Sequence, residues 1–466
     1  MPAEPFRFHP PEPKNVLRKT LPDILPAAFF HIFRAMEPAD LLITPRWLLP
    51  IAPANVALEG HAVAITAGRI VAVGPVAQLQ ARFDAQEHVS RDSHVLMPGF
   101  VNAHTRASMA LMRDMRVSAP VHPWVIENSR PLITPEFVRD ATQFAIAEML
   151  QAGITAFGDW DWHPEEAART AAEARVRAAI ALPVYPSETY WAADLATHLE
   201  RAAHLADEYR ANPWVSTYFA PPSLRFLSDA MLDRVRSVAD ETDARIHMHV
   251  DSSVPDARDS VSQHGHRPLQ RLGRLGLLGP AFTALDPIDL EAEDVELARD
   301  SGLSVVAYAE RVFFMGGLCP VSTLLAAGIP VGFSSCVPMR RGPFDVLAEA
   351  RVADQFADVP KMTPAEALQA ATLGGAVALG LGADCGSVEP GKAADLVCID
   401  LSSFACRSYA TIPDAVLFGA TRRDVTDVWT GGRAAVTDSQ LLAFDEDELL
   451  RLARRWAREA QSGAFP

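Results

Sequence analysis

Short apolar strands alternate with helical stretches along most of this chain. Between about Pro98 and Gly386, runs such as ITAFGDW, ARIHMHV, LSVVAYA and IPVGFSS are each followed by a segment with helical periodicity. Alternation sustained over this length is typical of parallel βα units. The sequence therefore predicts an α/β fold with a (β/α)8 barrel, and a doubly wound open sheet is the alternative.

The two ends of the chain share a second pattern of short β-rich runs. HAVAITAGRIVAVGP contains a turn at Ala67-Gly68-Arg69, and DVTDVWTGGRAAV contains one at Gly431-Gly432. We expect one β-sandwich built from both chain ends. The predicted organisation is an N-terminal extension (1–37), the sandwich (38–97 and 387–440), the barrel (98–386) and a C-terminal amphipathic helix (441–466).

The composition of the chain excludes some classes of binding partner. The chain has 466 residues, with 42 Lys and Arg against 58 Asp and Glu and a formal net charge of -16, so its field repels nucleic acid and anionic lipid. No stretch reaches about 18 consecutive apolar residues. Five cysteines without a C-x-x-C pair, and no signal-peptide pattern, indicate a reducing cytoplasm. We expect a cytoplasmic protein that binds a small molecule, with no nucleic-acid or membrane partner.

Polar residues stand where two predicted barrel strands end, which is where barrel enzymes place reactive groups. The run VNAHTR ends with His104 and Arg106, and HMHVDSS carries His247, His249 and Asp251 on alternate positions of another strand. A single histidine is more often structural than functional, but two such runs favour a site at the barrel mouth.

Taken in order, the motifs PGFVNAHTR, HMHVDSS, LLAAGIPVGFSS and GSVEPGKAADLV resemble the amidohydrolase superfamily. The most similar branch holds the triazine chlorohydrolases and the methylthioadenosine/S-adenosylhomocysteine-type deaminases. The resemblance extends from about Ala39 to about Arg455. It implies the same barrel with a β-sandwich made from both chain ends, and it implies a homodimer.

The resemblance also implies a site with one divalent metal, bound by a His-x-His pair, a later histidine and a closing aspartate, with a glutamate and a histidine that move protons. In this sequence His104 and His249 match two of the metal ligands. The other positions of the family site carry different residues, namely Arg106, Ser252, Asp286, Cys336 and, on the substrate side, Pro222. The metal site is therefore expected to be degenerate.

Most of the replacements are charged or reactive side chains. Such residues favour a site with a changed function over a pocket that has lost its function and been filled with inert side chains. We assign catalytic roles to Arg106, His249, Asp286 and Cys336. Cys336 is either packing or a nucleophile whose pKa is lowered by nearby positive charge. Expected substrate-binding residues are His104, Asp251, Tyr190, Tyr308 and Phe313.

These residues predict altered, metal-independent chemistry that acts on a small nitrogen-containing or heterocyclic molecule. No cofactor is expected. Two alternatives stay open. One is a catalytically inactive protein that binds or regulates an active enzyme, and the other is a zinc-dependent hydrolase or deaminase using His104, His249 and Cys336. Arg106 argues against the zinc site, because a guanidinium at a former ligand position repels a dication.

Overall fold

The barrel is an eight-stranded parallel sheet in the order β13-β12-β11-β10-β9-β8-β7-β6. The computed structural model describes residues 36–113, 133–189, 191–250, 254–313, 316–336, 342–357 and 361–461. The strands are β6 (Phe100–Thr105), β7 (Ile154–Asp159), β8 (Arg177–Pro183), β9 (Val215–Ala220), β10 (Arg245–His249), β11 (Phe282–Leu285), β12 (Ser304–Ala307) and β13 (Val331–Phe333). The predicted (β/α)8 barrel is confirmed.

Side chains at the carboxyl ends of β6 and β13 join the first and last strands. The Asn102 amide donates to the carbonyl oxygen of Ser335 (3.2 Å) and accepts from the Ser335 amide N–H (2.9 Å). The Ser334 hydroxyl donates to the carbonyl oxygen of His104 at 2.6 Å. These bonds fix the two strand ends that carry His104 and Cys336.

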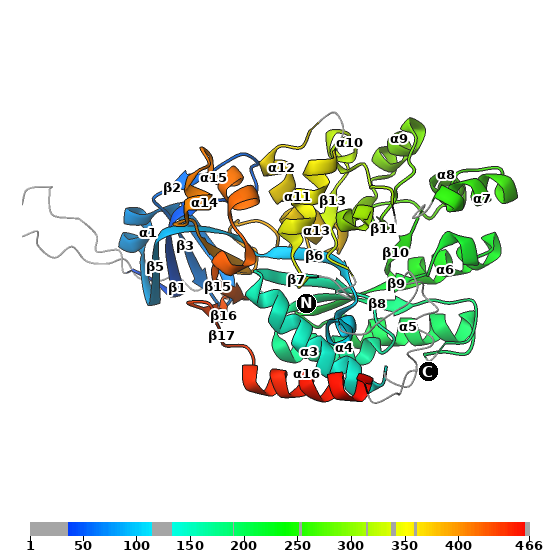
Figure 1. Cartoon of the computed structure of the whole chain (residues 1–466), viewed down its shortest axis with the longest axis horizontal. Helices are drawn as coiled ribbons and strands as arrows, with labels where there is room; N and C mark the ends of the chain where they lie inside the picture. Colours follow the sequence, from blue (N-terminus) through cyan, green and yellow to red (C-terminus); the bar gives the residue numbers. More distant parts are fainter. Residues whose placement is uncertain are drawn as a thin grey trace, which may run out of the picture. The chain divides into compact units, whose positions relative to one another are not determined.

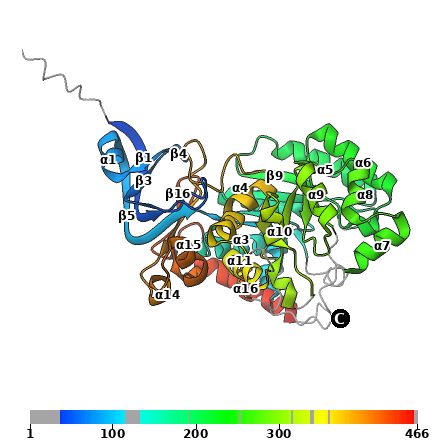
Figure 2. The same ribbon diagram turned by 90° about the horizontal axis from the view of Figure 1, so that it is seen from above.

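Helices surround the barrel strands (Figure 1, Figure 2). Several begin at the side-chain caps that the sequence offers: Thr134 accepts from the Phe137 N–H, Asp194 from Thr197 and Asp345 from Ala348. The helices are α3 (Pro135–Gln151), α4 (Pro164–Ala174), α5 (Leu195–Tyr209), α6 (Asp229–Thr242), α7 (Val254–His264), α8 (Pro268–Arg274), α9 (Ala292–Ser301), α10 (Val321–Ala326), α11 (Val346–Phe356), α12 (Pro364–Gln369) and α13 (Gly375–Ala378).

A second sheet of nine strands contains segments from both ends of the chain, as predicted (Figure 1). Its order is β17-β16-β15-β14-β5-β1-β3-β4, with β2 paired to β1. Both predicted hairpin turns are present, with positive φ at Gly68 and at Gly431 and Gly432. The parallel pair β1/β5 was not anticipated. The strands are β1 (Glu37–Leu48), β2 (Leu58–Glu59), β3 (His61–Thr66), β4 (Arg69–Pro75), β5 (Phe83–Pro98), β14 (Leu396–Asp400), β15 (Val425–Thr430), β16 (Arg433–Thr437) and β17 (Gln440–Leu441).

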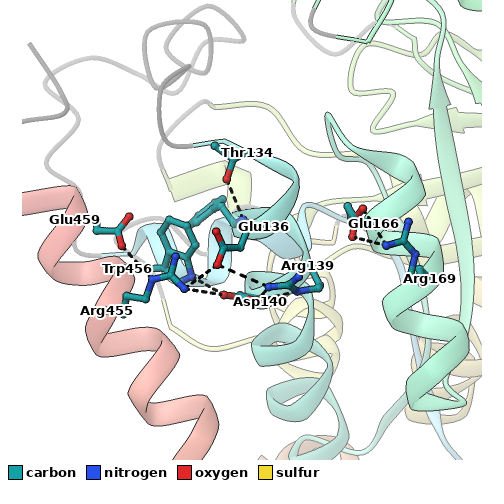
Figure 3. Close-up of polar contacts among 10 residues, drawn as sticks. Thr134, Glu136, Arg139, Asp140, Glu166, Arg169, Arg455, Trp456 and Glu459 are labelled. Carbon is teal, nitrogen blue, oxygen red and sulfur yellow. Dashed lines mark hydrogen bonds and ion pairs between the residues drawn. The ribbon is translucent and has the colours of Figure 1, made fainter.

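The C-terminal helix α16 (Glu446–Gln461) lies against α3 (Figure 3). The Trp456 ring meets Phe137 edge-on at 5.0 Å between centroids, and its indole N–H donates to Asp140 at 3.0 Å. Arg455 forms an ion pair with Glu136 at 2.9 Å. These contacts pack the C-terminal helix against α3. Three further short helices are α1 (Val76–Arg82), α14 (Phe404–Arg407) and α15 (Ile412–Asp414).

Residues Glu37–Pro466 form one compact unit. The boundaries given above for the sandwich and the barrel therefore stay a prediction. Residues 1–35 of the predicted N-terminal extension lie outside the described residues, and its last residue, Glu37, begins β1. Within the described ranges, every helix is too short or too polar to span a lipid bilayer.

Candidate functional site

Two histidines meet at the carboxyl ends of the barrel strands. The rings of His104 on β6 and His249 on β10 lie 5.5 Å apart between centroids, with an interplanar angle of 88°. Both ring nitrogens of His104 are buried and have no hydrogen-bond partner among the described residues. Burial lowers the pKa of His104 and lowers that of His249 to about 4, and Arg106 adds repulsion in both cases. Both rings are therefore neutral near pH 7.

Arg106 supplies positive charge beside these rings. It follows β6 and precedes the 3-10 helix Ala107–Met112, and its guanidinium stacks over the Trp160 ring at 4.1 Å. Among the described residues, no carboxylate lies within ion-pair distance of Arg106. Trp160 in turn contacts Trp162 edge-on at 4.9 Å, and Tyr185 lies next to both indoles. Arg106 and the three aromatic rings thus form one packed cluster beyond the end of β7.

Asp159 and Asp161, at the end of β7, hold the segment that carries Arg106. Asp159 accepts from the Ala107 N–H at 2.8 Å, and Asp161 accepts from the Ser108 N–H at 3.3 Å. Burial raises the pKa of both carboxyls, and Arg106 opposes the shift. Arg106 and Asp161 also line a cavity of about 10 Å3, which is room for one water molecule.

Asp286 forms a buried ion pair with a residue that the sequence analysis did not single out. Arg311 Nη1 lies 2.6 Å from Asp286 Oδ2, and the Tyr308 N–H donates to the other carboxylate oxygen at 3.3 Å. Asp286 has a positive φ of 51°, in the left-handed region that non-glycine residues rarely occupy. Burial raises the pKa of Asp286 to about 6, against the opposing charge of Arg311. The only signal for Arg311 in the sequence is an arginine three residues after Tyr308, in the run YAER.

A second residue missed from the sequence is Glu349 on α11. Its buried carboxylate accepts from the backbone N–H groups of Ala309 (2.8 Å) and Glu310 (3.0 Å). It therefore fixes the start of the 3-10 helix Ala309–Phe313 that carries Arg311. Burial raises the pKa of Glu349 well above its usual range. The available signal was a glutamate on the otherwise apolar face of a predicted helix.

The remaining predicted residues are only partly brought to this site. Cys336 follows β13 and is half-buried. Burial raises its pKa to about 12 and outweighs Arg106, so the expected lowering of this pKa is wrong. Tyr308 is buried beside Asp286, whereas Phe313 is 61% exposed and contacts Phe356. Asp251 and Tyr190 lie outside the described residues.

Within the described residues, the donors at the barrel mouth are fewer than the metal that the family implies would need. Catalytic zinc takes three protein ligands. In the part of the chain that the structure describes, no three His, Cys, Asp or Glu side chains come together in a way that could hold a metal ion. The alternative trio of His104, His249 and Cys336 is thus not assembled there. Arg106 further places a fixed positive charge near both histidines, which disfavours a dication.

Comparisons with known proteins agree with the fold. The amidohydrolase family matches residues 95–435. A 5-methylthioadenosine/S-adenosylhomocysteine deaminase of Saccharophagus degradans is 31% identical over 437 residues, covering 91% of this chain and 98% of the relative. A crystal structure of an adenosine deaminase from Xanthomonas campestris with bound zinc has a TM-score of 0.87 at 36% identity, covering 92% of this chain and 100% of that one.

A more distant structure shares the fold alone. Atrazine chlorohydrolase from Arthrobacter aurescens, complexed with zinc, has a TM-score of 0.79 at 20% identity and covers 89% of this chain and 99% of its own.

Proposed function

Because the chain belongs to the amidohydrolase family, we propose that it acts on a small nitrogen-containing heterocycle at the carboxyl-terminal mouth of the barrel. Relatives named as deaminases of 5-methylthioadenosine and of adenosine support this substrate class, and they favour hydrolytic displacement of a ring substituent. The aromatic cluster of Trp160, Trp162 and Tyr185 lies beside Arg106, and we expect a planar ring to pack near it.

The observation that supports our proposal for the mechanism is the charge of Arg106. Its guanidinium is stacked on Trp160 and forms no close ion pair with a carboxylate of the described residues, and the nearby buried Asp159 and Asp161 interact with it only at longer range. A guanidinium placed in this way binds an anionic or carbonyl oxygen, or a ring nitrogen on which negative charge develops. We propose that Arg106 supplies the positive charge that a metal supplies in the family, so that the chemistry is metal-independent.

Proton transfer in this proposal belongs to Asp286 and His249. Water adds to the ring carbon that bears the leaving group, one water proton passes to the base, and the base returns it to the departing group. Asp286, with a pKa of about 6, is closer to neutral pH than His249, with a pKa of about 4, and is therefore the better-matched proton carrier. Arg311 keeps its carboxylate oriented.

A turnover experiment tests the proposal. Ammonia release from adenosine and 5-methylthioadenosine, and chloride release from atrazine, would be measured after chelation and again with added zinc. We expect turnover that survives chelation and falls by about 100-fold or more in Arg106→Gln. The matched control is Arg299→Gln, which removes an exposed arginine from α9.

The outcomes separate the alternatives. Turnover that appears only with zinc would overturn the metal-independent part and favour the zinc hydrolase. Binding of a probe by calorimetry without any turnover would favour the inactive binding or regulatory protein. A protein that neither binds nor converts these heterocycles would overturn the substrate class itself.

A further inference from the structure

A cavity of about 500 Å3 lies at the end of the barrel opposite to the mouth. Its walls include the first residues of β8 and β9, Arg177 and Val215, and the segment Asn212–Trp214 that precedes β9. Arg69, from the hairpin turn between β3 and β4, closes one side. This volume is within the usual range for small-molecule sites, which often lie where two layers of a protein meet.

The walls are richer in positive charge than the chain as a whole. Arg69, Arg177 and Arg210 line the cavity against two acids, Asp243 and Asp384, although the protein carries a formal net charge of -16. Arginine is the residue best suited to bidentate binding of carboxylate or phosphate. Each of the three arginines also has a carboxylate partner, so what the cavity offers an anion is the donor groups that these pairs leave unused.

Much of this hydrogen-bonding capacity is unused within the described residues. Arg210 donates through Nε alone, to Asp207 at 3.1 Å, which leaves both terminal nitrogens available. Arg69 donates one bond to the Gly391 carbonyl oxygen and one to Asp384 at 3.3 Å. Arg177 is more fully committed, to Asp395 and the Pro213 carbonyl oxygen. Arg210 and Arg69 are thus the groups able to meet an anion.

An additional arginine lies behind the wall. A Cβ atom on Gly380, which lines the cavity, would fall 2.7 Å from Cδ of Arg245, so glycine is required for this close packing. Among the described residues, Arg245 has no carboxylate partner, and burial lowers its pKa. It adds to the positive potential without being neutralised.

Aromatic rings and a serine hydroxyl without a hydrogen-bond partner among the described residues also line the cavity. Trp214 and Tyr209 line it, and the Trp214 ring is held by the guanidinium of Arg177 at 5.2 Å. A Cβ on Gly431 would meet that ring at 2.6 Å, so the hairpin glycine permits the contact. The Ser216 hydroxyl is buried at the wall and has no hydrogen-bond partner among the described residues.

We propose that this cavity is a second ligand site, separate from the barrel mouth, for a small planar anion: an aromatic or heteroaromatic ring that bears a carboxylate or a phosphate. Arg210 and Arg69 bind the anionic group. The ring stacks against Trp214, and Ser216 bonds to a polar ring atom. This inference does not depend on the proposed function of the mouth.

Calorimetric titration tests it with four probes: adenosine 5′-monophosphate (ring and phosphate), nicotinate (ring and carboxylate), nicotinamide (uncharged ring alone) and inorganic phosphate (anion alone). We expect at least one of the first two to bind tenfold or more tightly than either single-feature probe. That affinity should fall at least tenfold in Arg210→Gln and in Trp214→Leu. The matched control for the charge change is Arg234→Gln, on an exposed position of α6.

Folding of each variant would be checked by circular dichroism, and the titration repeated in Arg106→Gln. Binding that persists in Arg106→Gln and is lost in Arg210→Gln supports the second site. Binding lost in Arg106→Gln but kept in Arg210→Gln assigns the probe to the barrel mouth and overturns the proposal. Absence of binding by both adenosine 5′-monophosphate and nicotinate also overturns it.

Discussion

The carboxylate of Asp286 and the guanidinium of Arg311 lie 2.6 Å apart at the barrel mouth, with both side chains buried. The acid occupies a position at which the family resemblance implies a different residue, and its partner lies 25 residues later in the chain. Asp286 and Arg311 depend on each other, because a charge buried at either position is strongly unfavourable without its partner.

Removing one member of this pair should destabilise the fold more than removing both. Arg311→Leu leaves an uncompensated buried carboxylate, and we expect a loss of about 3–5 kcal/mol in the free energy of unfolding. The double variant Asp286→Leu with Arg311→Leu should recover much of that loss. Urea denaturation of the two single variants and the double variant completes the cycle. Additive losses would show that the two residues do not interact.

The pH dependence of stability should contain two opposing contributions. The pKa of Asp286, raised to about 6, lies above its unfolded value, so stability from this residue is lost as pH rises from about 4 to 6. The pKa of His249, lowered to about 4, lies below its unfolded value, so stability is lost as pH falls from about 6.5 to 4. Each contribution is about 3 kcal/mol, and the two nearly cancel.

Two variants expose these contributions separately. Relative to the wild type, His249→Asn should lose stability as pH rises from 4 to 6, and Asp286→Asn should lose it as pH falls over the same range. Chemical denaturation at several pH values measures both. The same slope in both variants would contradict the assignment.

Metal content is the most direct check of the donor set at the mouth. We expect purified wild-type protein, dialysed without chelator, to contain well below one zinc per chain by inductively coupled plasma mass spectrometry. The physical reason is the positive charge of Arg106 beside His104 and His249. One zinc per chain that disappears in His249→Ala would refute this prediction.

Cys336 should behave as a protonated thiol. Because burial raises its pKa to about 12, alkylation by iodoacetamide at pH 7 should be much slower than for a free thiol with a pKa of about 8.5. Peptide mass spectrometry would follow the labelling, with a short cysteine peptide in the same tube as the reference. Cys336→Ser should leave turnover within about threefold, because a thiol held protonated is a poor nucleophile. Rapid labelling together with lost turnover would restore the nucleophile hypothesis.

Local patterns predicted most of the architecture, but not the parallel pairing of β1 with β5. Strand-helix alternation predicted the parallel barrel, and the turns at Gly68 and Gly431 predicted the hairpins of the second sheet. Strand-end positions also brought His104, His249 and Arg106 to one end of the barrel, because the carboxyl ends of parallel strands meet there. These features follow from periodicity and turn chemistry, which act over a few residues.

The sequence by itself determined the barrel, the sheet built from both chain ends, and the strand ends at which charged groups stand. Only the tertiary structure decided how those charges are paired. Asp286 is matched by Arg311, Glu349 holds the segment that carries Arg311, and Arg106 rests on Trp160 without a carboxylate partner among the described residues. The pKa of Cys336 was likewise set by burial. Such pairings join distant segments, and both ion pairing and desolvation depend on position in the folded protein.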